Sequence, residues 1–164
     1  MVFSVGHGEM TTWMIRRTVA ADAERLSELA HRAKAHWGYP PSWLARWDAA
    51  LTITPSYVEA HAVFAAEDDD GIAAFCALED QGEHWVLEHV WVAPERHGRG
   101  IGRALVRHAL AHAHAIRPGR VQVTSDPGAA EFYARLGARR TGSVAAPMEG
   151  APDRELPVFE IATG

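Results

Sequence analysis

The chain has 164 residues, 48% hydrophobic and 23% charged, which is enough for one domain with its own core. Its formal net charge of −5 argues against a nucleic-acid partner, because proteins that bind nucleic acid carry clustered positive charge. The single cysteine, Cys76, excludes an internal disulfide framework, and no apolar stretch approaches the roughly 20 residues that span a bilayer.

The N-terminal stretch MVFSVGHGEMT (1–11) lacks the basic and apolar regions of a signal peptide. We expect it to be a flexible tail of a single domain that covers residues 1–164. The segment WMIRRTV (13–19) then predicts a first strand. With no leader and one cysteine, the sequence favours a cytoplasmic protein.

Two helices are predicted after this strand. Apolar residues recur at steps of three and four over 21–37, and Gly38 ends the pattern, as glycine often ends a helix. A shorter helix is predicted over 42–51 with Ser42 as its N-cap, because a serine oxygen can accept the free N–H groups of the first turn. A further turn is expected at 55–60.

Three strands are predicted next, at 62–68, 71–80 and 84–94, separated by the turn sequences DDDG and QGE. Within the third strand, WVLEHVWV is apolar at both odd and even positions. That pattern is typical of a central strand that is covered on both faces.

The last third of the chain alternates between the two kinds of element. Asp126 is the expected N-cap of a short helix, and Gly137 its expected end. The predicted elements are a helix over 100–117, a strand over 120–125, a helix over 127–137, and strands over 138–144 and 155–162. The order predicts one mixed α/β layer.

The stretch HGRGIG (97–102) places three glycines directly before the long helix. The first N–H groups of a helix lack intrahelical partners, and glycine lets an anion come close to them. Arg96, Arg99 and Arg103 add positive charge. The spacing fits neither the Walker A motif nor the dinucleotide fingerprint. The turn therefore predicts a phosphate site; the alternative is a tight strand-to-helix connection with scattered arginines.

Two linked segments resemble the GNAT superfamily of N-acetyltransferases: VWVAPERHGRGIGRAL (90–105) and DPGAAEFYARLGARRTG (126–142). The resemblance implies a mixed, mostly antiparallel central sheet flanked by helices and splayed between its fourth and fifth strands. Two positions depart from the family pattern. His97 stands where the family usually has glutamine or arginine, and Asp126 stands where it has asparagine.

The resemblance also implies acetyl-coenzyme A as cofactor. Its pyrophosphate is expected on the backbone N–H groups of the glycine turn, and its pantetheine arm is expected along the strand that precedes the turn. The expected cofactor-binding residues are Val90, Trp91, Val92, His97, Gly98, Arg99, Gly100, Ile101, Gly102, Arg103, Asp126 and Tyr133.

Acetyl transfer needs a proton acceptor for the amine and benefits from a proton donor for the departing thiolate. Tyr133 occupies the position of the family's general-acid tyrosine; the alternative is a ring packed beside Phe132. Glu88 interrupts an apolar strand and is the expected base, acting through water; the alternative is a structural ion pair. His84 and His89 are weaker candidates.

The acceptor amine is expected beside His36, Trp37 and Tyr39, because the resemblance implies an acceptor wall at the first helical hairpin; a helix end anchored by aromatic residues is the alternative. His108 and His112 lack a third ligand nearby, so no metal site is predicted.

The sequence thus predicts an acetyl-CoA-dependent N-acetyltransferase that acts by direct attack on a primary amine of a small molecule, without a membrane or nucleic-acid partner. The alternatives are a protein or aminoacyl-tRNA acceptor and a non-catalytic acyl-CoA sensor, and a homodimer is left open.

Overall fold

A computed structural model of the chain describes residues 2–4 and 12–164. The chain divides into two compact units. Unit 1 comprises Met1–Leu78 and His89–Ala109, and unit 2 comprises Glu79–Glu88 and Leu110–Gly164. In the described part of the chain, no helix has the length and apolar character needed to cross a membrane.

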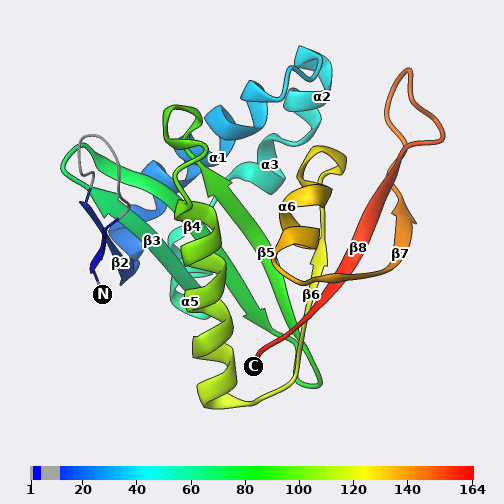
Figure 1. The fold of residues 1–164 in the computed structure, drawn as a ribbon. Coiled ribbons are helices and arrows are strands. Elements are labelled where there is room, and N and C mark those ends of the chain that lie inside the picture. Colours follow the sequence, from blue (N-terminus) through cyan, green and yellow to red (C-terminus); the bar gives the residue numbers. More distant parts are fainter. Residues whose placement is uncertain (1, 5–11) are drawn as a thin grey trace. The chain divides into compact units, whose positions relative to one another are not determined.

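The strands of unit 1 form an antiparallel succession (Figure 1). They are β1 (Val2–Ser4), β2 (Thr12–Arg17), β3 (Ala62–Asp68) and the greater part of β4 (Gly71–Asp80). Strand β1 pairs with β2, so the expectation of a flexible tail is wrong for residues 2–4. The other residues of that expected tail, 1 and 5–11, lie outside the described residues.

The first helical region of unit 1 begins as predicted but is divided more finely. It contains η1 (Ala20–Asp22), α1 (Ala23–His36), α2 (Pro41–Arg46), α3 (Asp48–Leu51) and α4 (Pro55–Ala60). Ser42 is not an N-cap, because α2 begins one residue earlier with Pro41 in its first turn. Proline suits that position, since its ring fixes φ and its missing N–H would be unpaired there.

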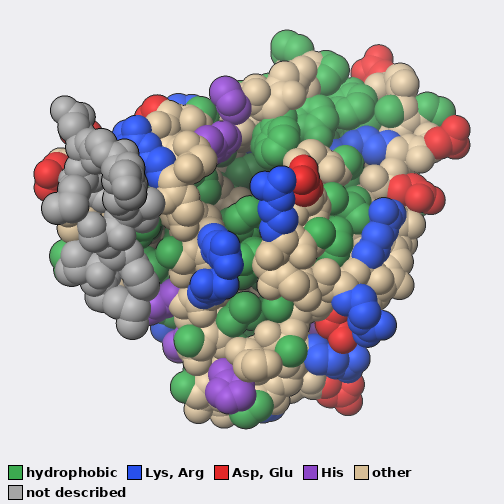
Figure 2. All heavy atoms as spheres, viewed as in Figure 1, with side chains coloured by type: hydrophobic (Ala, Val, Ile, Leu, Met, Phe, Trp, Pro, Cys, Tyr) green, Lys and Arg blue, Asp and Glu red, His purple; other side chains and the backbone are tan. Residues whose placement is uncertain are grey.

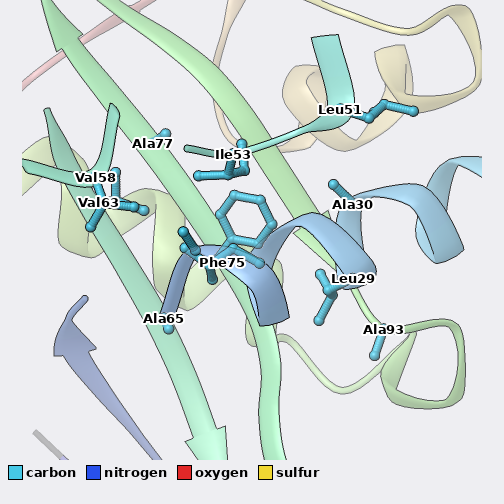
Figure 3. Close-up of a cluster of buried hydrophobic side chains, with 12 residues drawn as sticks. Leu29, Ala30, Leu51, Ile53, Val58, Val63, Ala65, Phe75, Ala77 and Ala93 are labelled. Atoms are coloured by element: carbon cyan, nitrogen blue, oxygen red, sulfur yellow. The ribbon is translucent and has the colours of Figure 1, made fainter. Parts of the chain in front are cut away.

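The hydrophobic core of unit 1 lies between α1 and strands β3 and β4. Phe75 of β4 lies at the centre of this cluster, with Leu29 and Ala30 of α1 and Ile53 around it (Figure 3). These residues are at least 95% buried. Full burial of each large apolar side chain contributes about 1.5–3 kcal/mol, so this cluster holds α1 against the strands.

The remainder of unit 1 leads from strand β5 (Trp85–Val92) through η2 (Pro94–Arg96) into helix α5 (Ile101–Ile116), which continues into unit 2. The prediction that β5 is covered on both faces is wrong. Trp85, Leu87 and His89 are buried, whereas Glu88, on the other face, is exposed.

Unit 2 contains the start of β5, then β6 (Arg120–Thr124), η3 (Pro127–Ala129), α6 (Ala130–Arg135), β7 (Arg139–Ala145) and β8 (Glu155–Ala162). β8 lies beside β6 and β7 and is antiparallel to both (Figure 1). β5 and β6 are parallel, and their paired residues are Trp85↔Val121 and Val86↔Gln122.

The strand pairings confirm the predicted fold class, a mixed and mostly antiparallel sheet with flanking helices. The expected splay involves the fourth and fifth strands of the family pattern, which are β5 and β6 here because β1 adds a strand at the N-terminus. The strand pairing between β5 and β6 is confined to the first two residues of β5, as expected of strands that splay apart.

Candidate functional site

The glycine turn lies in unit 1, between η2 and α5. Gly98 and Gly100 both have φ of +77°, a left-handed conformation that side chains disfavour. A Cβ atom built at either glycine would meet no atom within 4 Å. The first helical hydrogen bond joins the N–H of Ala104 to the carbonyl of Gly100. The N–H groups at the start of α5 therefore lie beside backbone that a ligand can approach closely.

Arg96 does not have the role that the sequence suggested for it. Its Nε donates to Asp68 Oδ2 at 2.7 Å and its Nη2 donates to Asp70 at 3.3 Å, so its charge is already paired. The Arg96 and Asp68 side chains are 15% and 4% exposed. This ion pair fixes η2 to the β3–β4 hairpin and so positions the backbone that enters the turn.

An Asp68→Asn variant should lose thermal stability and bind coenzyme A three- to fivefold more weakly. Breaking the pair leaves Arg96 partly buried without its counter-ion, at a cost of about 1–3 kcal/mol. Arg96 lowers the pKa of Asp68, so this stabilisation is present at neutral pH and disappears as the carboxylate protonates below about pH 4. Melting temperature against pH and calorimetric binding of coenzyme A measure both effects.

Asp70→Asn is the matched control for this prediction. Asp70 also accepts from Arg96, but its side chain is 87% exposed, and exposed ion pairs contribute little. If Asp68→Asn and Asp70→Asn behave alike, the buried pair does not position the turn.

His97, the residue before the glycines, bonds within unit 1. Its Nε2 lies 3.2 Å from the carbonyl oxygen of Val92, so this nitrogen is the donor. Its ring meets that of His36 edge to face, with centroids 5.5 Å apart. Figure 2 shows histidine side chains at the surface near the end of α1. Since Nε2 already donates to β5, the expectation of phosphate binding rests on the backbone of the glycine turn.

The predicted acceptor residues all lie at the end of α1 or just beyond it. Trp37 is 44% exposed, and His36 is also exposed. Tyr39 differs from both, because its ring stacks on Trp43 at 5.7 Å and meets Trp47 edge to face at 5.0 Å.

This aromatic cluster is larger than the sequence analysis anticipated, since Trp43 and Trp47 were missed. Their signal was the repeated spacing of four in YPPSWLARW, which brings aromatic residues together on a helical segment. Apolar side chains gather at the surface over α2 (Figure 2).

In unit 2, Tyr133 is buried on α6. Its ring lies 5.0 Å from that of Phe132 and 6.0 Å from that of Phe159. The helix ends in a Schellman motif, in which the Ala138 N–H bonds to the Tyr133 carbonyl and Gly137 has φ of +88°. Because this motif sets the end of α6, the backbone of the YARLG segment fixes where Tyr133 lies on the helix.

Asp126 begins this segment as predicted. Its Oδ1 accepts the backbone N–H of Gly128 at 3.0 Å, so the carboxylate caps η3. The cap needs only a side-chain oxygen that accepts a hydrogen bond, and aspartate supplies one as asparagine does, which explains how Asp126 can stand where the family has asparagine.

Glu88, also in unit 2, is an exposed side chain on β5. Desolvation by its surroundings, followed by the nearby Glu79 carboxylate, raises its pKa above the usual value. In unit 2, as far as the structure describes it, no arginine or histidine forms an ion pair with Glu88. A carboxylate with a raised pKa is better suited to accept a proton near neutral pH.

The histidines of α5 do not gather with other potential ligands. The ring of His108 meets Phe64 edge to face at 4.7 Å. Within residues 2–4 and 12–164, no three His, Cys, Asp or Glu side chains are arranged as metal ligands.

Sequence comparisons agree with this geometry. Residues 59–137 match the family model of an acetyltransferase (GNAT) domain. A mycothiol acetyltransferase from Nocardia farcinica is 31% identical over 159 residues, which cover 96% of this chain and 50% of that protein. The chain thus spans about half the length of this curated relative.

Solved structures show the same fold. A GCN5-related N-acetyltransferase from Rhodopseudomonas palustris superposes with a TM-score of 0.79 at 18% identity, covering 96% of this chain and 99% of that one. The PaiA N-acetyltransferase from Thermoplasma acidophilum, solved in complex with coenzyme A, gives 0.72 at 16% identity, covering 92% and 98%.

These features define a class of protein first: a mixed α/β fold in which an open glycine turn precedes a long helix. Within that class, the family model, the curated relative and the fold agree with the resemblance seen in the sequence. The chain belongs to the GNAT superfamily of N-acetyltransferases, whose co-substrate is acetyl-CoA.

Proposed function

We propose that this protein is an acetyl-CoA-dependent N-acetyltransferase that acetylates a primary amine of a small molecule by direct attack. The observation that carries the proposal is the glycine turn, with left-handed Gly98 and Gly100 and open space above both. A cytoplasmic location belongs to the proposal, because the single cysteine fits a reducing compartment.

The backbone of Gly98–Arg103 would bind the pyrophosphate of acetyl-CoA. Main-chain N–H groups at a helix N-terminus suit this role, because the helix dipole favours negative charge there. The peptide groups of Val90–Val92 would bind the pantetheine arm as an added strand would. The ladder between β5 and β6 occupies only the earlier residues Trp85 and Val86 of β5.

The chemistry divides between three groups of the chain. The cofactor supplies an acetyl thioester; the amine nitrogen bonds to its carbonyl carbon, and the carbon–sulfur bond breaks. Glu88 would receive the proton lost by the amine, through water. Strand N–H groups near Val90 and Trp91 would stabilise the oxyanion, and Tyr133 would donate its hydroxyl proton to the departing thiolate.

A small-molecule acceptor is favoured over a protein or aminoacyl-tRNA for two reasons. The net charge of −5 disfavours RNA, whose binding depends on positive charge. The curated relative, mycothiol acetyltransferase, is named for a small molecule.

The proposal is tested by incubating the protein and acetyl-CoA with a panel of amines and measuring the release of free coenzyme A thiol. Thiol release that depends on an amine, with a matching acetylated product, supports the proposal. Tight binding of acetyl-CoA without transfer to any amine, peptide or aminoacyl-tRNA would instead identify an acyl-CoA sensor.

A Glu88→Gln variant should lose about fivefold in turnover at pH 7 and approach the wild-type rate near pH 10. An alkylamine with a pKa of about 10.4 needs help to deprotonate at neutral pH but not at high pH. The rate between pH 6 and 10 measures the effect. The pKa of Glu88 is raised in the folded protein, so its ionisation destabilises the fold as the pH rises. Removing this charge in Glu88→Gln should therefore not lower the melting temperature at pH 7.

Glu79→Gln serves as the companion variant. Removing the Glu79 carboxylate should lower the pKa of Glu88 and move the acidic limb of the rate profile to lower pH. A Glu88→Gln protein with an unchanged rate profile and a lower melting temperature would show that Glu88 is a structural residue.

A further inference from the structure

His89, on β5, is a buried histidine to which the proposed chemistry gives no role. Its side chain is 9% exposed and lies in unit 1 near two other aromatic rings. The ring centroid of Tyr57, on α4, is 5.9 Å away, and that of Phe75, on β4, is 6.0 Å away. A buried imidazole costs free energy unless its nitrogens form hydrogen bonds. An apolar side chain would avoid that cost, so what histidine adds at this position is its hydrogen bonding.

The hydrogen bond joins His89 to Trp91, two residues further along the same strand. The indole Nε1 of Trp91 donates to Nδ1 of His89 at 3.0 Å. An indole N–H only donates, so Nδ1 carries no proton and the neutral imidazole carries its proton on Nε2. Residues two apart in a strand lie on the same face of the sheet, which is why these two side chains meet.

Trp91 belongs to two parts of the proposed site. It is in the segment Val90–Val92, which under the proposed function binds the pantetheine arm. Its ring is partly buried and packs against the hydrophobic core of unit 1. Nζ of Lys34, in the last turn of α1, lies 5.9 Å from the centroid of Trp91 and 4.2 Å from that of Trp47. The indole of Trp91 therefore faces the helical region in which the acceptor is expected.

We propose that His89 is a positioning residue for the acceptor amine. Through its unprotonated Nδ1 it holds the Trp91 indole in one orientation, and that indole contacts the apolar part of the acceptor. The proposal rests on the proposed function, since it places the acceptor beside Val90–Val92. A ring that is already held loses less conformational freedom when a ligand binds, so the hydrogen bond favours acceptor binding. His89 itself touches no reacting atom.

The first measurement does not need turnover. The chain has six tryptophans, and in a ¹H–¹⁵N NMR spectrum the indole signal of Trp91 is the one that Trp91→Phe removes. His89→Phe keeps a ring and removes the acceptor, so this signal should shift and exchange with water about tenfold faster. His89→Asn should keep the signal protected, because the asparagine Oδ1 can accept where Nδ1 did.

The second measurement is a double-mutant cycle on the acetylation of phenethylamine, hexylamine and tryptamine. His89→Phe should raise KM for the best of these amines about fivefold, the effect of losing one hydrogen bond. kcat and the affinity for acetyl-CoA should change less than about twofold, and His89→Asn should restore KM. In a Trp91→Phe background, adding His89→Phe should change nothing further, because His89 acts only through the indole N–H.

His61→Phe is the matched control, because it makes the same change at another histidine whose ring contacts Tyr57, at 4.5 Å. It should leave the indole signal and the kinetics as in the wild type. Should His89→Phe fail to fold, His89→Asn and Trp91→Phe decide: the first should match the wild type, and the second should raise KM.

The outcomes separate this proposal from the proposed function. An indole signal that stays protected in His89→Phe, or losses that add in the double variant, would show that His89 only fills the core. Transfer to other amines but to none of these three would overturn the apolar contact while the acetyltransferase activity stands. A wild-type protein that acetylates no amine would contradict the proposed function and this role together.

Discussion

A Tyr133→Phe variant should turn over about 100-fold more slowly than the wild type while binding acetyl-CoA with nearly the same affinity. Phenylalanine keeps the ring that packs against Phe132 and Phe159, so the fold of α6 is retained. What is lost is the hydroxyl that we propose as the proton donor for the thiolate, and general acid catalysis typically contributes 10²–10⁴-fold. The thiolate is a moderate leaving group, so the loss lies at the lower end of that range.

The measurement is kcat with a saturating amine, alongside calorimetric binding of acetyl-CoA. Tyr57→Phe is the matched control, because it removes the hydroxyl of a tyrosine outside α6, which is partly buried and whose ring meets that of His89 edge to face. Should Tyr133→Phe keep its full turnover, the tyrosine is a packing residue.

A Gly100→Val variant should bind coenzyme A at least tenfold more weakly, a loss of about 1.4 kcal/mol. The structure gives this substitution two effects. A branched side chain fills space that is open above the glycine, where a phosphate would lie. It also strains a backbone held at φ of +77°, which costs roughly 1–2 kcal/mol for a residue with a side chain.

The two effects are separated by Gly150→Val in unit 2. Gly150 has φ of +79° and open space above it, so the backbone strain is matched, but it is not at a helix N-terminus. Both variants should melt at lower temperatures, and only Gly100→Val should lose affinity for coenzyme A. Normal affinity in a folded Gly100→Val protein would refute phosphate binding at the turn.

The strand and turn positions of this protein were largely predictable from local patterns. The predicted strands at 62–68, 71–80 and 155–162 coincide with β3, β4 and β8. The Asp126 cap and the helix end at Gly137 were also predictable, because both depend on the backbone needs of a few adjacent residues.

Among the predictions from the sequence that were wrong, one concerned Ser42 and one concerned Val2–Ser4. Ser42 was a plausible cap, but Pro41 begins α2, and proline at the first helical position decides the start. The segment Val2–Ser4 is too short to show the alternation over about four to eight residues by which a strand is recognised. In the structure it pairs with β2 and forms β1.

The sequence alone determined the glycine turn, since Gly98 and Gly100 adopt a conformation that the glycine residues themselves permit. Only the tertiary structure decided that Arg96 pairs with Asp68, 28 residues away, and that Lys34 lies among Tyr39, Trp47 and Trp91. The physical reason is range. Backbone conformation follows from neighbouring residues, whereas the partner of a charge depends on which distant elements the hydrophobic core brings together.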